Sequence, residues 1–156
     1  MKTINLCENT DFPNKIGKGT RILGIDPGKK NIGISISDPS QKIATPLKII
    51  FMKKFKKFIE DLNRVIMDYE IKGIVVGNPI NMDGSIGPRS QSAKDFAQNI
   101  SKMTNLPITL WDERLSSDGA FSLMDDLDIN SSKKTKKLDQ HAAAFILQGY
   151  LDFLNK

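Results

Sequence analysis

The chain has 156 residues, of which 39% are hydrophobic and 26% charged, which is typical of one soluble globular domain. No apolar run approaches the roughly 20 residues that a membrane-spanning helix needs, and residues 1–20 lack the apolar centre of a secretory signal. A single cysteine, Cys7, excludes an internal disulfide framework and a cysteine-rich zinc site. We therefore expect a cytoplasmic protein without a membrane partner. The net charge of +5 is compatible with a polyanionic partner but does not establish one.

The first half of the chain predicts three strands. Residues 1–19 have no clear periodicity, and we expect them to form a loose N-terminal extension ahead of one domain over residues 20–156. Arg21–Asp26 is a short apolar run that ends on an acid, and Asn31–Asp38 alternates Ile with small residues. A turn that contains glycine joins these two strands into a hairpin, and Ile43–Ile50 adds a third antiparallel strand.

Helices and strands alternate in the rest of the chain. Apolar residues at helical spacing predict a helix over residues 51–69, and the continuous apolar run Gly73–Gly77 predicts a buried parallel strand. A helix from Pro88 to about Met103 and a strand over Pro107–Trp111 follow.

The last third of the chain is expected to hold a short helix at about Ser117–Met124, a polar and mobile segment over Asp125–Lys137, and a closing helix over Leu138–Leu154. The resulting order is β-β-β-α-β-α-β-α-α. It predicts an α/β fold of ribonuclease-H-like order, with a mixed five-stranded sheet and helices on both faces.

Three acids lie where an α/β sheet exposes ligands: Asp26 ends the first strand, Glu113 follows the last strand, and Asp139 begins the closing helix. Hydrolysis of a phosphodiester through two magnesium ions needs carboxylates that converge from separate segments, because Mg²⁺ prefers oxygen ligands and two ions about 3.5–4 Å apart can stabilise both the attacking and the leaving oxygen. Each acid alone has a plainer interpretation. Asp26 could begin a turn, Glu113 and its neighbour Asp112 could be solvated at a strand end, and Asp139 could interact with a helix dipole. The three together favour a metal site.

Other kinds of catalytic site find little support in the sequence. There is no phosphate-binding P-loop motif. With one histidine, His141, and no Gly-x-Ser-x-Gly motif, a Ser-His-Asp hydrolase has little support. His141 is interpreted as a surface or packing residue, and Trp111 as a core residue.

Four motifs between about Arg21 and Asp152 occur in the order of a known family. They are Gly24–Gly33 (GIDPGKKNIG), Val75–Gly84 (VVGNPINMDG) followed by Gly87-Pro88, Asp112–Ser116 (DERLS), and Asp139 with Ala142-Ala143 and Ile146–Leu151. With these motifs the chain resembles the YqgF family, the pre-16S rRNA nucleases that are also described as Holliday-junction-resolvase-like.

The resemblance implies a ribonuclease-H-like fold, a role in maturing the 5′ end of ribosomal RNA, and an acidic triad at Asp26, Glu113 and Asp139. We expect these acids to hold Mg²⁺ or Mn²⁺ as two ions, with Asp26 between them. The family pattern, rather than the spacing, favours Glu113 over Asp112. Two departures from the pattern bear on the choice of substrate: Pro27 replaces a usual aromatic residue, as in true junction resolvases, and Asn31 replaces a usual basic one.

Further polar residues are predicted to contact phosphates. One group lies in a glycine-containing loop before a helix N-terminus, where backbone amides can hold an anion, and other groups are basic. The predicted set is Lys29, Lys30, Asn81, Asp83, Gly84, Arg89, Arg114, Lys133, Lys134, Lys136 and Lys137.

Three rival functions remain open at this point. A resolvase of four-way DNA junctions would be expected to form a homodimer, because the junction has two-fold symmetry. The sequence leaves both a monomer and a homodimer open. A nucleotide-binding module of the actin and sugar-kinase type also carries an acid on its first strand, but it needs a much longer chain. A non-catalytic RNA-binding protein could retain the acids without turnover. The expected partner is thus nucleic acid, either an RNA precursor or branched DNA.

Overall fold

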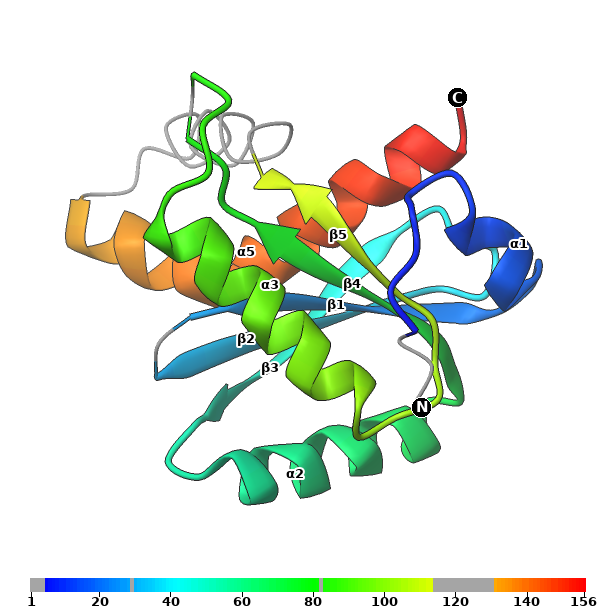
Figure 1. Ribbon diagram of the computed structural model, residues 1–156, viewed down its shortest axis with the longest axis horizontal. Coiled ribbons are helices and arrows are strands. Elements are labelled where there is room, and N and C mark those ends of the chain that lie inside the picture. The colour runs from blue at the N-terminus through cyan, green and yellow to red at the C-terminus, as the bar shows by residue number, and fades with distance from the viewer. Residues whose placement is uncertain (1–4, 29, 82, 114–130) are drawn as a thin grey trace.

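The computed structural model describes residues 5–28, 30–81, 83–113 and 131–156, and in the last helix it describes the side chains from His141 onward. A five-stranded sheet with the strand order β3-β2-β1-β4-β5 forms its centre (Figure 1). The first three strands pair antiparallel, whereas β4 is parallel to both β1 and β5. The strands are β1 (Arg21–Pro27), β2 (Asn31–Ser37), β3 (Ala44–Phe51), β4 (Ile71–Asn78) and β5 (Ile108–Asp112). The predicted mixed five-stranded sheet is confirmed.

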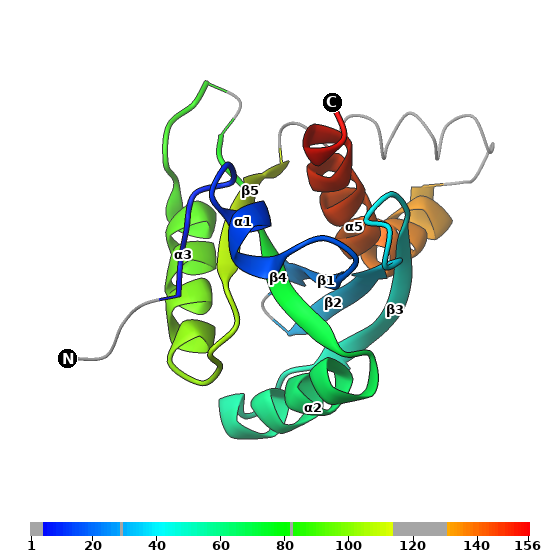
Figure 2. The same ribbon diagram turned by 90° about the vertical axis from the view of Figure 1, so that its right-hand side faces the viewer.

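Helices cover both faces of the sheet (Figure 2). One face packs against α2 (Phe55–Asp68) and α3 (Pro88–Ser101), and the other packs against α5 (Ser131–Leu154) and the short α1 (Phe12–Ile16). Alternation along the strands decides which side chain faces which layer. On β1, Leu23 and Ile25 join the core under α2 and α3, while Ile22 joins the core under α5.

Small residues allow α5 to lie close to the sheet. A Cβ atom on Gly24 would lie 2.8 Å from Cβ of Leu147 and 3.1 Å from the carbonyl oxygen of Ala143. The buried Ser35 hydroxyl donates to that same carbonyl at 2.8 Å. The small side chain of Ala143 is compatible with this close approach.

The expectation of a loose N-terminal extension is wrong for residues 5–19, because these residues pack against the domain. The backbone of Cys7 donates to the carbonyl of Ile108 at 2.9 Å, and Ile108 donates back to Asn5 at 3.0 Å, so this segment runs parallel to the outer edge of β5. In α1, Phe12 and Ile16 are buried against β4 and α5. The prediction failed because two apolar residues in one short helix create no readable period.

The closing helix is also longer than expected, because α5 begins at Ser131 rather than at Leu138. The lysine-rich part of the predicted mobile segment is therefore helical, consistent with the good intrinsic helix propensity of lysine. The predicted helix at 117–124 and the remainder of that polar segment lie outside the described residues. In the described ranges, no helix is long and apolar enough to span a membrane.

Candidate active site

Three parallel strands end at the same edge of the sheet. Asp26 is the penultimate residue of β1, while Asn78 and Asp112 end β4 and β5 and are paired neighbours. On the left of Figure 1, this edge lies beside the first turns of both α3 and α5. Ligand sites in open α/β sheets form beyond the carboxyl ends of the strands. The sheet therefore collects acids from distant parts of the chain at one edge.

Asp26 and Glu113 meet at this edge. Glu113 follows β5 in a helical turn, and its side chain shares a hydrogen bond with the side chain of Asp26. The carboxylate of Glu113 lies over Gly77 of β4, where an added Cβ would lie 2.5 Å from Oε1. Only a residue without a side chain leaves this space, so Gly77 admits Glu113 to the site.

The electrostatic environment of Glu113 disfavours its charged form. Burial raises its pKa most, and the charge of Asp26 raises it further, while the Arg89 guanidinium acts in the opposite direction. Asp112 adds a smaller repulsion, and the net result is a pKa of about 7. Asp26 and Glu113 are half-buried carboxyl groups that repel each other when both are ionised, and a bound cation would reduce this repulsion.

A hollow of about 380 Å³ opens in front of Asp26. It runs from the β1–β2 turn toward α3 and toward the end of β3, and it is lined by Asp26, Gly28, Lys30, Asn31, Gly33, Ile49 and Arg89. Lys30 and Arg89 are exposed. A negatively charged group that entered this hollow would therefore approach Asp26 between two cations.

The loop between β4 and α3 is held by its own side chains. Asp83 accepts from the backbone amide of Ser85 at 2.9 Å and from its hydroxyl at 2.6 Å, and Asn81 donates to the same hydroxyl at 3.0 Å. Gly84 adopts a φ of 89°, which favours glycine. At the base of the loop, the buried Ser90 hydroxyl donates to Asn78 at 2.6 Å and fixes α3 to the end of β4.

Comparison with known proteins identifies the family of this chain. The family described as "RuvX: Holliday junction resolvase" matches residues 20–153. The chain belongs to this family. A protein of Pelagibacter ubique named "Putative pre-16S rRNA nuclease" is 54% identical over 145 residues, which cover 93% of this chain and 96% of the relative. A protein of the same name from Rhodobacter capsulatus is 44% identical and covers 92% of this chain and 91% of its own length.

Two solved structures resemble this chain in fold. Thermus thermophilus RuvC in complex with a Holliday junction substrate matches with a TM-score of 0.53 at 13% identity, over 88% of this chain and 97% of that chain. A second Thermus thermophilus RuvC structure matches with a TM-score of 0.50 at 11% identity, over 87% and 97%. The ribonuclease-H-like order predicted from the sequence is thereby confirmed as the fold.

The structure brings some of the predicted site residues together. Asp26 and Glu113 are in direct contact, Lys30 and Arg89 line the hollow beside Asp26, and the side chains of Asn81 and Asp83 bond within their own loop. The backbone of Asp139 belongs to α5, as do those of the predicted basic residues Lys133, Lys134, Lys136 and Lys137, but their side chains lie outside the described part of the structure. Lys29 and Arg114 fall outside the described residues altogether.

Three positions in the site were not predicted from residue chemistry. Gly77 makes room for Glu113, and Asn78 and Ser90 join the strand end to α3. One signal was available for the first of them, since a glycine inside an apolar strand marks a close approach. The hydrogen bond between Asn78 and Ser90 joins two ordinary polar residues, and nothing in their local sequence indicates it.

The donors at this edge fit a divalent metal. Asp26 and Glu113 offer carboxylate oxygens, which suit Mg²⁺ and Mn²⁺. The pKa of Glu113 is raised by burial and by the charge of Asp26, and a bound cation would favour the ionised form of both groups. Among the residues that the structure describes, no group of three possible metal ligands is found. The remaining acid of the predicted triad, Asp139, belongs to α5, and its side chain lies outside the described part of the structure.

Proposed function

We propose that this protein is a divalent-metal-dependent nuclease that hydrolyses phosphodiester bonds in maturing the 5′ end of pre-16S rRNA. The observation that carries the proposal is the contact between Asp26 and Glu113 at the carboxyl ends of the strands, in front of a hollow with two cations. Relatives that carry the nuclease name and match almost the whole chain supply the substrate class.

The proposed ligand set is Asp26, Glu113 and Asp139, which would hold two ions of Mg²⁺ or Mn²⁺. Such ions, when bound, supply stabilisation of both the attacking and the leaving oxygen of the phosphodiester. Glu113 has to lose its proton to act as a ligand, and its neighbour Arg89 favours the ionised form. Within this account Gly77 is the positioning residue, because it sets where the Glu113 carboxylate can lie.

Lys30 and Arg89 are proposed to bind the substrate backbone. Both are exposed side chains on the walls of the hollow that contains Asp26. Phosphate contacts of this kind position a nucleic acid without reading its sequence. Replacing either one is expected to weaken binding for every sequence to a similar extent.

The second candidate is a resolvase of four-way DNA junctions, which the description of the matching family favours. Both candidates use the same carboxylates, so the substrate rather than the site separates them. Resolution of a junction needs two paired cuts, and this would require two copies of the chain related by a two-fold axis.

The test is cleavage of a labelled precursor rRNA fragment and a synthetic four-way DNA junction, side by side, with Mg²⁺ or Mn²⁺. Asp26→Asn protein, purified in the same way, controls for contaminating nucleases. RNA cutting that Asp26→Asn abolishes supports the proposal, and junction cutting alone keeps the metal nuclease but changes its substrate. Binding without cutting of either substrate would contradict the enzyme and favour a non-catalytic RNA-binding protein.

A further inference from the structure

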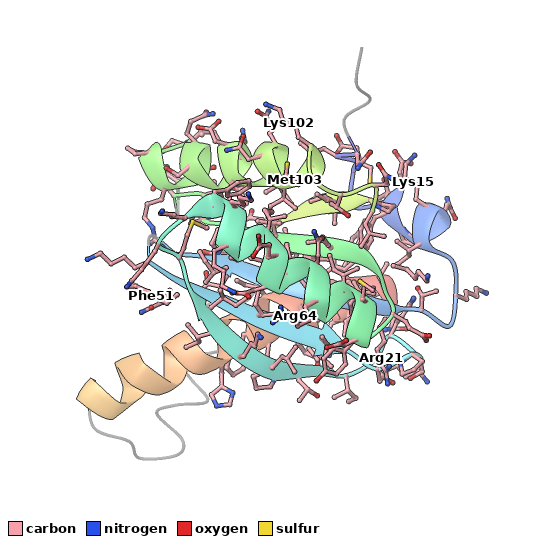
Figure 3. All side chains as sticks on the ribbon, turned by 90° about the horizontal axis from the view of Figure 1, so that it is seen from below. Lys15, Arg21, Phe51, Arg64, Lys102 and Met103 are labelled. Carbon is pink, nitrogen blue, oxygen red and sulfur yellow. The ribbon has the colours of Figure 1, made fainter. Side chains whose placement is uncertain are left out.

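Two large apolar side chains are exposed at the end of β3. Ile49 is 38% exposed and Phe51 is 56% exposed, whereas Ile50 between them is only 5% exposed. Phe51 lies at the end of the molecule where α3 and α5 begin (Figure 3). We refer to Ile49, Phe51 and the neighbouring Lys53 as the β3 shelf.

The β3 shelf lies on the same face of the sheet as Asp26. Asp26 pairs with Gly33 on β2, and Gly33 pairs with Ile49 on β3, so the three form one row across the sheet. Phe51 lies two residues beyond Ile49 and so projects from the same face, opposite Asn31. Ile49 and Asp26 line one hollow. The shelf is therefore a continuation of the candidate active site.

Positive charge accompanies the shelf. Nζ of Lys53 lies 5.9 Å from the centroid of the Phe51 ring, and Lys30 is exposed on the wall of the adjoining hollow. An aromatic ring beside cations that follow one path is the arrangement by which proteins bind single-stranded nucleic acid, because the ring stacks on a base and the cations contact phosphates.

We propose that the β3 shelf binds an unpaired nucleotide of the substrate next to the bond that is cut, with its base stacked on Phe51 and its backbone held by Lys30 and Lys53. This deepens the proposed function and rests on it. Bases inside a duplex are stacked on one another, so their faces are not accessible to a ring at the edge of a sheet. The nucleotide next to the cut is therefore unpaired.

A second copy of the chain fits the shelf less well. β3 is an edge strand and edges can pair with other chains. A two-fold contact through the shelf, however, would bring the same patch of each copy together, so that the lysines of one copy would face those of the other. The charge on the shelf complements phosphate instead.

The test measures binding of a short single-stranded RNA that carries 2-aminopurine, to the full chain in EDTA so that no cleavage occurs. Stacking on an aromatic ring quenches 2-aminopurine, and removing one such stack is expected to weaken affinity about tenfold. Phe51→Ala and Phe51→Leu should both show this loss and abolish the quenching, while Phe51→Tyr should restore both. Met67→Ala, a change at a 77% exposed residue of α2 on the opposite face, should bind as the wild type does.

Three results would overturn the shelf proposal. One is equal affinity for the RNA in wild type and Phe51→Ala proteins of equal thermal stability. Another is that Phe51→Ala loses affinity equally for single-stranded RNA and for a duplex of the same sequence. The third is a change in sedimentation on Phe51→Ala without a change in RNA affinity, which would identify a protein interface. A separate result would overturn the proposed function. It is that, with Mg²⁺ or Mn²⁺, wild type protein cleaves no RNA or DNA beyond what Asp26→Asn protein also cleaves.

Discussion

Asp38 and Glu113 each directly follow a strand of the same sheet, yet their surroundings shift the pKa in opposite directions. Asp38 accepts the backbone amides of Lys42 and Ile43, each at 2.9 Å, and a bond from the Ser40 hydroxyl. These donors, led by the Ile43 amide, lower the pKa of Asp38 to about 2. Glu113 is instead buried against another carboxyl group, and its pKa rises to about 7.

The difference separates an acid that closes a turn from an acid that is buried beside another carboxyl group. Backbone donors satisfy Asp38 as soon as the chain between β2 and β3 folds back, so this acid stabilises the fold without any ligand. The contact of Glu113 with Asp26 disfavours the charged pair, and a fold keeps such an arrangement where function needs it.

The largest effect is expected for the catalytic rate. Asp26→Asn should lower RNA cleavage by roughly a thousandfold or more, because a lost metal ligand removes several kcal/mol of charge stabilisation. Asp38→Ala removes an acid of the same type just after the last residue of β2, whereas Asp26 pairs near the first residue of that strand. This variant should keep the rate within about twofold of wild type. Single-turnover cleavage with saturating metal measures both. Equal rates for the two variants would remove the distinction between the acids.

Gly77→Ala should lower the rate by about a hundredfold, since an added Cβ would lie 2.5 Å from Oε1 of Glu113 and displace it. Gly73→Ala is the matched control on the same strand. Its Cβ would lie 2.5 Å from Cγ2 of Ile16 and 2.6 Å from Cζ of Phe12, at the end of β4 away from the acids.

Both glycine variants are expected to lose stability by about 1–3 kcal/mol through overpacking, so urea unfolding should not separate them. Only Gly77→Ala should lose activity beyond what its unfolded fraction explains. A Gly73→Ala protein that stays folded but is equally inactive would contradict the positioning role of Gly77.

In metal-free protein, Glu113→Gln should raise the free energy of unfolding by about 2 kcal/mol at pH 8 and change it little at pH 5. The reason is the raised pKa of Glu113, because the folded state binds the proton more tightly than the unfolded chain. Wild type stability therefore falls as the pH rises from about 4.5 to about 7, whereas the neutral amide does not titrate. Urea unfolding in EDTA at the two pH values measures this, and an equal difference at both would exclude the assigned cause.

The smallest effect is expected at the turn that Asp38 closes. Asp38→Ala should lower the free energy of unfolding by about 1 kcal/mol at pH 7, through the loss of charge-assisted bonds at a partly exposed site. Because the folded pKa is depressed, this contribution is present above about pH 3.8 and is lost as the pH falls toward about 2. Unfolding of wild type and variant at pH 7 and pH 3 should show the difference shrink, and a constant difference would assign it to packing.

Sequence patterns predicted the parts of the fold that carry strong periodicity. The alternation in Asn31–Asp38 and the apolar run Gly73–Gly77 predicted two strands of the sheet, and the apolar run that ends on Asp26 predicted a third. Parallel strands bring their carboxyl ends together, so convergence of Asp26 with the acids at the end of β5 follows from strand order. These conclusions need only local pattern and topology.

Other features depend on contacts between distant residues. Phe12 and Ile16 are core residues of a segment that looks unstructured, because their partners lie on β4 and α5. Spacing could not choose between Asp112 and Glu113, since a helical turn follows β5 and ends the alternation. The resemblance indicated Glu113, and the space over Gly77 supplies the physical reason for its position. The start of α5 was misplaced because lysines suit both helices and polar loops.

Binding of Mn²⁺ by the RNA-free protein, followed by electron paramagnetic resonance at pH 8, tests most directly whether the paired carboxylates form a metal centre. We expect wild type protein to bind the ion, Asp26→Asn and Glu113→Gln each to lose at least tenfold in affinity, and Asp38→Ala to bind as wild type does. Unchanged Mn²⁺ affinity in Asp26→Asn and Glu113→Gln proteins that remain folded would contradict it.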